Sequence, residues 1–115
     1  MKKIEAIIRP QRIEDVKEAL RKLDIKGLTV LDAQGYGKQL GHKEIYRGQE
    51  YTVDLVRKAK LEIIVEDNLV ESAIKAIIES ARSDKGGAIG DGKIFIYPVE
   101  DVVRIRTGER GSAAV

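Results

Sequence analysis

The sequence contains no cysteine, and only 4% of its 115 residues are aromatic. Without thiols the chain can form no disulfide, no thiolate metal site and no cysteine nucleophile. The few aromatic residues leave little on which nucleic-acid bases could stack. Neither sign of charge dominates, because 21 basic residues stand against 19 acidic ones, whereas a dedicated nucleic-acid binder carries a basic excess. These shortages argue against thiol chemistry and against nucleic-acid binding.

Long apolar runs are also lacking, since none approaches the roughly 18 residues that a membrane span needs. The N-terminal stretch MKKIEAIIRP is interrupted by Glu5 and Arg9, unlike a signal peptide. We therefore expect a soluble, cytoplasmic protein. Its length fits one domain over residues 1–115. With 43% hydrophobic residues this domain can bury a core, and oligomerisation would add to the limited burial of a small chain.

The hydrophobic pattern predicts a strand–helix–strand unit that occurs twice. Alternating apolar residues favour strands, and apolar residues three or four positions apart favour amphipathic helices. This order predicts an α+β fold, a ferredoxin-like βαββαβ sandwich with two helices on one face of an antiparallel sheet. The expected strands are residues 4–8, 28–34, 58–65 and 93–99, and the first expected helix is residues 12–24. A second helix is expected after Asp67, which would be its N-cap. The residues that this helix would bury are Val70, Ile74, Ile77, Ile78 and Ala81.

The strands also carry apolar residues on the face that the helices leave open. Ile7, Ile64, Phe95 and Tyr97 lie out of phase with the predicted core positions. Each such side chain contributes roughly 1.5–3 kcal/mol when fully buried, and together they would form a patch unusual on a monomer. We expect this face to pack against sister subunits in a closed homo-oligomer.

Residues 37–56 separate the two units and show no sustained period. A loop of this length in a small domain is usually either functional or disordered. Its content, with Ile45, Tyr46, Tyr51 and Val53, suits a segment that docks on a partner, although length alone leaves an idle insertion open.

Two glycines, Gly90 and Gly92, flank Asp91 just before the last predicted strand. Such glycines let backbone N–H groups converge on an anion, and Lys93 adds a point charge. An ordinary tight turn remains the alternative for this motif alone. Residues 87–93 also match the G-x-x-x-x-G-K part of a P-loop, but an isoleucine stands where Ser or Thr must reach magnesium, and a strand follows instead of a helix. We reject the P-loop.

Two arginines, Arg104 and Arg106, occur in residues 102–106, which we predict to be extended. In an extended segment both guanidiniums project to the same side, and each presents a planar fork suited to phosphate oxygens. Together with Lys93 and the glycine turn, they predict a phosphate-sized cationic site.

Three motifs in this order resemble the PII signal-transduction family. They are YRGQEY over residues 46–51, IGDGKIF over residues 89–95 and RIRTGE over residues 104–109. The opening KKIEAIIRP and GYGKQ at residues 35–39 match as well, so that the resemblance covers essentially the whole chain.

This resemblance implies a non-enzymatic homotrimeric sensor that binds ATP or ADP between subunits and, with Mg-ATP, 2-oxoglutarate. Its implied nucleotide-binding residues are Thr29, Gly35, Gly37, Lys38, Gln39, Glu62, Ile64, Gly90, Asp91, Gly92, Lys93, Arg104 and Arg106. Those implied for 2-oxoglutarate are Gln39, Leu40, Gly41 and Lys58, with Gln39 coordinating Mg beside ligand oxygens.

The resemblance further implies a long mobile effector loop at residues 37–56, a glycine-rich nucleotide-site loop at residues 82–92 and a C-terminal loop region at residues 102–115. Tyr51 occupies a position that is uridylylated in some members, and Arg47 resembles an arginine that contacts the ammonium channel. The implied partners are an ammonium-channel protein and regulators or enzymes of nitrogen metabolism. Nucleic acid is not among them, and a membrane would be met only through the channel.

Some positions depart from the family pattern. Lys38 stands where many members have arginine, and the stretch at residues 83–88 is longer than usual, which leaves the preference between ATP and ADP open. A PII-like protein of the same fold that senses bicarbonate or another adenine nucleotide is the alternative. An enzyme is disfavoured, because the sequence offers no convincing set of acid, base and nucleophile.

Overall fold

The computed structural model describes residues 1–37, 43–46, 48–52, 55–84 and 86–115. Its strands are β1 (Lys2–Ile8), β2 (Thr29–Gly35), β3 (Lys43–Tyr46), β4 (Gln49–Thr52), β5 (Val56–Val65) and β6 (Gly92–Pro98). Its α-helices are α1 (Ile13–Arg21) and α2 (Val70–Ala81), and its short 3-10 helices are η1 (Pro10–Arg12), η2 (Asp67–Leu69) and η3 (Gly111–Ala114). No helix in these described ranges is both long and apolar enough to cross a bilayer.

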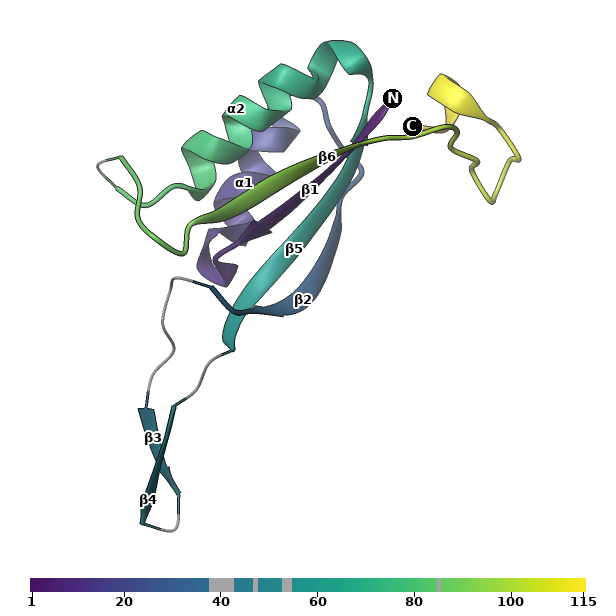
Figure 1. Cartoon of the computed structure of the whole chain (residues 1–115). Coiled ribbons are helices and arrows are strands. Elements are labelled where there is room, and N and C mark those ends of the chain that lie inside the picture. The colour runs from purple at the N-terminus through teal and green to yellow at the C-terminus, as the bar shows by residue number, and fades with distance from the viewer. Residues whose placement is uncertain (38–42, 47, 53–54, 85) are drawn as a thin grey trace.

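Four strands form an antiparallel sheet in the order β2-β5-β1-β6. Both helices cover the same face of this sheet (Figure 1). The arrangement confirms the predicted α+β ferredoxin-like fold. The chain passes from β1 through α1 to β2, and from β5 through α2 to β6, so that each half repeats one strand–helix–strand unit.

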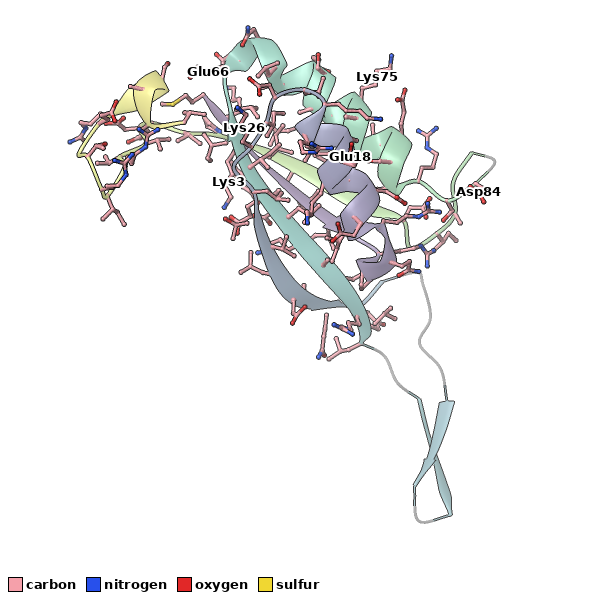
Figure 2. All side chains as sticks on the ribbon, turned by 180° about the vertical axis from the view of Figure 1, so that it is seen from behind. Lys3, Glu18, Lys26, Glu66, Lys75 and Asp84 are labelled. Carbon is pink, nitrogen blue, oxygen red and sulfur yellow. The ribbon has the colours of Figure 1, made fainter. Side chains whose placement is uncertain are left out.

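The core lies between the sheet and the helices, where alternate strand residues meet one stripe of each helix. Charged residues such as Glu18 and Lys75 lie on the outer helix faces (Figure 2). In α2 the predicted stripe was partly wrong: Ala73 is fully buried, whereas Ile78 remains 37% exposed. The buried core consists of Ile4, Ala6, Ile8, Val16, Leu20, Ala59, Leu61, Ile63, Val65, Ala73, Ile77 and Ala81.

The opposite face of the sheet is uncovered in the single chain. Phe95 and Tyr97 are 41% and 43% exposed there. Between them and β5 lies a charged group, in which the Lys3 ammonium is 2.6 Å from the Glu62 carboxylate and 5.6 Å from the centre of the Tyr97 ring. The hydrogen bond to Glu62 raises the pKa of Lys3. Apolar residues thus occur on both faces of the sheet, as predicted. The sister subunit that would cover the open face stays a prediction.

Two local expectations are wrong. Asp67 does not cap α2, because η2 intervenes and the Asp67 carboxylate accepts a hydrogen bond of 2.9 Å from the N-terminal ammonium of Met1. The first helix begins at Ile13 instead of residue 12, since η1 occupies the turn that follows β1, and it ends at Arg21.

Residues 37–56 were predicted to be a loop, but they contain a hairpin of β3 and β4. Lys43 pairs with Thr52, and Tyr46 pairs with Gln49. The four-residue strands are too short to produce a clear period in the sequence, which explains why pattern analysis missed them. Figure 1 shows the hairpin extending away from the four-stranded sheet.

Candidate functional site

The glycine-rich loop, residues 82–92, is organised around one carboxylate. Asp91 accepts hydrogen bonds from the backbone N–H groups of Ser83 at 3.0 Å and Ala88 at 2.8 Å, and also from the Ser83 hydroxyl. The Arg9 Nε donates a further bond of 3.3 Å. Although partial burial alone would raise the pKa of Asp91, these donors hold it well below its usual range. The carboxylate therefore shapes the loop from within.

Two cations tie the same loop to the sheet. A terminal nitrogen of Arg9 donates to the Ile89 carbonyl at 2.9 Å, and the Lys58 ammonium donates to the Gly90 carbonyl at 2.7 Å. Lys58 is only 8% exposed, and its pKa is lowered by burial and then by the nearby Arg9 charge, with Asp91 acting in the opposite direction. Two consecutive peptide groups of the loop are thus held by Lys58 from β5 and by Arg9, which directly follows β1.

The glycines on either side of Asp91 both have a positive φ, and the Asp91 N–H donates to the Ala88 carbonyl at 3.2 Å. Gly90 has φ of 98° and Gly92 has φ of 116°, both in the region that favours glycine. At Gly92 a side chain would collide with β1, because an added Cβ would lie 1.7 Å from the carbonyl oxygen of Ile7. The loop can enter β6 in this way only with glycine at position 92.

A pocket of about 600 Å³, here called the lysine pocket, opens beside this loop. The ends of β2 and β5 supply one wall, and the loop and β6 supply the other. Seven of the predicted ligand-binding residues line it, which are Gly35, Gly37, Lys58, Gly90, Asp91, Gly92 and Lys93. Sequence reasoning missed six further lining residues, which are Ile7, Tyr36, Val56, Ala88, Ile89 and Phe95.

Two of the missed residues could have been recognised from the sequence. Ile7 and Phe95 had been noticed as apolar residues on the uncovered sheet face. Ile7 pairs with Lys93 across β1 and β6, and this pairing places it at the end of the sheet where the loop begins. Predicting how β1 and β6 pair would therefore have shown that apolar residues also line the expected cationic site.

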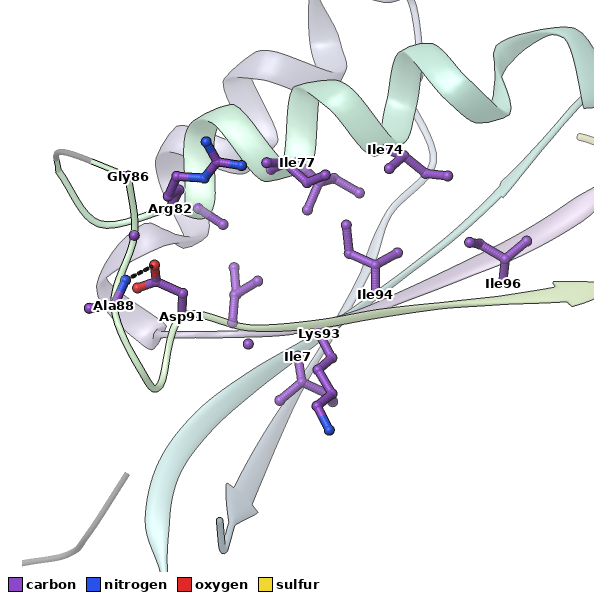
Figure 3. Close-up of a pocket in the computed structure, with 15 residues that line it drawn as sticks. Ile7, Ile74, Ile77, Arg82, Gly86, Ala88, Asp91, Lys93, Ile94 and Ile96 are labelled. Atoms are coloured by element: carbon purple, nitrogen blue, oxygen red, sulfur yellow. Dashed lines mark hydrogen bonds between the residues drawn. The ribbon is translucent and has the colours of Figure 1, made fainter. Parts of the chain in front are cut away.

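A second pocket of about 480 Å³, here called the isoleucine pocket, lies between α2 and β6. Ile74 and Ile77 line one side of it and Ile94 and Ile96 the other (Figure 3). In Figure 3 Lys93 projects from β6 away from Ile94, as alternation along a strand requires. The polar backbone and the two lysines favour the lysine pocket as the site of anion chemistry.

Three other predicted nucleotide residues lie elsewhere on the sheet. Thr29 pairs with Glu62, and Ile64 pairs with Lys3. From Lys58 to Ile64 the strand β5 runs for roughly 20 Å, so one chain does not bring this group to the lysine pocket. The hydrogen bond from Lys3 lowers the pKa of Glu62.

The two predicted arginines also lie away from the pocket. The C-terminal arm, residues 99–115, follows β6, whose seven residues span roughly 20 Å from the loop to the arm. Figure 1 shows the arm at the opposite end of the sheet from the loop. The prediction that Arg104 and Arg106 join Lys93 and the glycine turn is therefore wrong within a single chain.

The extended geometry predicted for residues 102–106 is also wrong from residue 105 onward. Residues 105–107 form a turn, in which the Gly108 N–H donates to the Arg104 carbonyl at 2.7 Å. The Arg104 guanidinium donates to the Glu109 carboxylate at 2.8 Å. The alternation rule that placed both guanidiniums on one side does not apply to a turn, and Gly108 with φ of 74° allows the chain to reverse here.

Several predicted positions lie outside the described residues. These are Lys38, Gln39, Leu40, Gly41 and Arg47. Tyr51 belongs to β4, where its backbone pairs with Glu44, and its role as a modification site stays a prediction. In the part of the chain that the structure describes, no three acidic or histidine side chains are grouped so as to hold a metal ion.

Comparison with known proteins identifies close relatives of the whole chain. Residues 1–109 match the family model described as nitrogen regulatory protein P-II. Proteins of that name from Azospirillum brasilense and Rhodospirillum rubrum are 58% and 55% identical over all 115 residues, which cover both chains completely. A crystal structure of Arabidopsis thaliana PII bound to citrate is 47% identical with a TM-score of 0.77, covering 98% of this chain and 87% of that one.

Proposed function

Because the chain belongs to the P-II family of nitrogen regulatory proteins, we propose that it senses nitrogen, carbon and energy status by binding ATP or ADP and, together with Mg-ATP, 2-oxoglutarate. Members of this family are regulators rather than enzymes. The observation that carries the proposal is the lysine pocket, where Lys58 and Lys93 lie beside the backbone of the glycine-rich loop. Ammonium groups are suited to phosphate and carboxylate groups.

A homotrimer would complete this pocket. One chain separates its predicted nucleotide residues by roughly 20 Å along β5 and β6, so that a single copy offers half a site at each end of the sheet. A neighbour related by rotation would bring the Arg104 and Arg106 of its arm to the lysine pocket of the first chain. Such head-to-tail contacts close into a ring. The exposed Phe95 and Tyr97 on the uncovered sheet face are consistent with this assembly.

Lys58 is the described residue best placed for the oxo-acid. Its ammonium lines the lysine pocket and already donates to the Gly90 carbonyl. An ammonium is a compact point charge with rotatable donors, which suits a ligand carboxylate. The citrate in the structure of the Arabidopsis relative supports a binding site for small polycarboxylates in this family.

Magnesium would enter with the triphosphate rather than occupy a protein site. Asp91 is the carboxylate among the described residues that line the lysine pocket, but its oxygens already accept bonds from Ser83, Ala88 and Arg9. The described lining thus supplies no carboxylate for the ion. Magnesium prefers ligand phosphates and water to an all-protein cage, and Gln39 would be the protein ligand.

Residues 37–56 would carry the output. Gly37 and Val56, at the two ends of this segment, both line the lysine pocket. A bound ligand would therefore contact both roots of the segment and favour one position of it, as an allosteric coupling requires. The regulated partners would be an ammonium channel and cytoplasmic proteins of nitrogen metabolism, contacted through Arg47 and Tyr51.

Calorimetry tests this proposal directly. We expect 2-oxoglutarate to bind in the presence of Mg-ATP and not in its absence. Lys58→Met should abolish that binding. It should also weaken ATP binding several-fold, because the Gly90 carbonyl loses a charged donor.

Lys75→Met serves as the matched control, since Lys75 lies on the outer face of α2, 4.0 Å from Glu79. It should leave both ligands unaffected. Equal binding of 2-oxoglutarate to the nucleotide-free protein would contradict the coupled site, and bicarbonate binding in place of the oxo-acid would indicate a different signal.

A further inference from the structure

The turn of the C-terminal arm carries a fully exposed apolar side chain on an ordered backbone. Ile105 is 100% exposed. The residue before it closes the turn, because the Arg104 N–H donates to the Glu109 carbonyl at 2.9 Å and the Arg104 carbonyl accepts from the Gly108 N–H at 2.7 Å. The turn is therefore formed before any partner arrives, and a contact made through Ile105 would not have to order it.

The isoleucine pocket lies along a free edge of the sheet. β6 is the last strand in the order β2-β5-β1-β6, so in the described chain no further strand adjoins its outer side. Ile94 and Ile96 project from β6 toward α2 (Figure 3). Ile96 is 47% exposed, and Ile78 on the α2 side of the pocket is 37% exposed. Exposed apolar side chains that gather around one cavity indicate a docking surface.

The isoleucine pocket and the lysine pocket are neighbours. They share five lining residues, which are Ile7, Ala88, Asp91, Gly92 and Lys93. Successive side chains of a strand point to opposite faces, so the two pockets use the two faces of β6 beside the same loop. In the assembly proposed above, Arg104 and Arg106 of a neighbouring copy reach the lysine pocket. Ile105 stands between these two arginines and would therefore arrive at the same edge of β6.

We propose that Ile105 of one copy docks in the isoleucine pocket of the next copy and anchors the arm beside the glycine-rich loop. This docking rests on the function proposed above, because the same arm carries the two arginines to the nucleotide. The occupant is a second copy of the chain, since β6 separates the arm from the loop of its own chain by roughly 20 Å. An apolar contact with charged side chains around it is the usual anatomy of a protein interface.

Cysteine cross-linking tests the docking cleanly, because the chain contains no cysteine of its own. Ile105→Cys combined with Ile78→Cys should give covalently linked copies on a denaturing gel after treatment with copper phenanthroline or a short bismaleimide. Ile78 lies in the last turn of α2, next to the loop, and Figure 1 shows the arm at the opposite end of the sheet. A disulfide requires Cα atoms within about 7 Å, so this pair can bond only between copies.

Ile105→Cys combined with Glu18→Cys is the matched control. Glu18 lies on the outer face of α1 (Figure 2) and is not among the described residues that line the isoleucine pocket. This pair should remain unlinked under the same conditions. Equal cross-linking of both pairs would mean random collision between copies and would overturn the docking.

Replacement of the docked side chain provides a second reading. Ile105→Ser removes the apolar group and keeps both arginines. Calorimetry should show ATP bound about tenfold more weakly, equivalent to about 1.4 kcal/mol, because the arm is no longer anchored. Ile105→Val keeps an apolar side chain and should stay within about twofold of the native affinity. Native ATP affinity in Ile105→Ser would overturn the anchoring role.

The two hypotheses fail in different ways. If native trimers bind ATP but the cysteines at positions 105 and 78 do not cross-link, then the isoleucine pocket has another occupant, such as a small apolar molecule, and the proposed function stands. If the native protein is monomeric and binds no adenine nucleotide, the proposed function falls, and the docking of Ile105 falls with it.

Discussion

The glycine-rich loop and the C-terminal arm lie at opposite ends of β6 and are held in different ways. The loop is fixed by distant parts of its own chain, since Arg9 and Lys58 each bond to its carbonyls. In the described chain, the hydrogen bonds and ion pairs of residues 101–115 join residues of the arm to one another. The loop is therefore prepared within one chain.

Apart from the Val99 N–H, which donates to the Met1 carbonyl at 3.3 Å, the described hydrogen bonds of the arm give it no comparable support from the rest of its own chain. Its Ile105 is fully exposed, and Val103 and Val115 are 49% and 46% exposed. Apolar side chains that extend from a chain in this way gain free energy by packing against another surface. The comparison thus indicates that the loop half of the proposed nucleotide site is held within one chain, whereas the arm keeps exposed apolar side chains that a neighbouring copy would cover in the proposed assembly.

The largest expected effect is a difference in stability between alanine substitutions of two glycines, one in the loop and one in the arm. Gly92→Ala should lower the free energy of unfolding by at least about 3 kcal/mol, because the added Cβ would lie 1.7 Å from the Ile7 carbonyl oxygen. Gly108→Ala in the arm meets no atom within 4 Å and should cost only about 1 kcal/mol for its positive φ. Denaturant unfolding at one protein concentration measures both, and equal losses would show that the arm is as constrained as the loop.

The next prediction tests whether the loop of one chain and the arm of another form one ATP site together. Lys93→Ala damages the loop half, and Arg106→Ala damages the arm half, so either variant alone should bind ATP on the order of tenfold to a hundredfold more weakly. In trimers assembled from equal amounts of both variants, roughly a quarter of the sites would combine an intact loop with an intact arm. We expect calorimetry to find that fraction with native affinity.

Separately assembled variants that are mixed without exchange of subunits are the control and should show no recovery. If the co-assembled trimers also failed to recover, then Lys93 and Arg106 would not share a site across copies.

The same contrast explains what the sequence could predict. The alternation of Ile4, Ala6 and Ile8 against Leu61 and Ile63 was enough to predict the sheet and its buried face, because this pattern depends only on neighbours along a strand. Seven residues that the motifs and the family resemblance named as ligand-binding line the lysine pocket. Its apolar lining was missed, because Ile7 and Phe95 enter the site through strand register.

The arm shows where sequence reasoning failed. Proximity in sequence suggested that Arg104 and Arg106 lie beside Lys93, but β6 places its full length between them. The Asp67 cap failed for a related reason, since the N-terminal ammonium of Met1 reaches that carboxylate through tertiary contact. Both errors concern partners that a local pattern does not contain.

The smallest expected effect is a difference in acid stability between substitutions of two carboxylates, Asp91 in the loop and Asp101 in the arm. The pKa of Asp91 is held below its usual value by Ser83, Ala88 and Arg9. The ionised group therefore stabilises the fold above about pH 4, and this contribution is lost as the pH falls toward the lowered pKa. Asp91→Asn should reduce the free energy of unfolding most at neutral pH, and the difference from the native protein should shrink below about pH 4.

Asp101 in the arm also has a lowered pKa, through the hydrogen bond from Arg110 and then that from the Val102 N–H. It is more exposed than Asp91, so water and salt screen its interactions. Asp101→Asn should therefore shift the acid unfolding curve less than Asp91→Asn does, and salt should reduce its effect further. Denaturant titrations between pH 3 and pH 7 compare the stabilities of the two variants. If both variants gave the same pH profile, the loop would be no more firmly held than the arm.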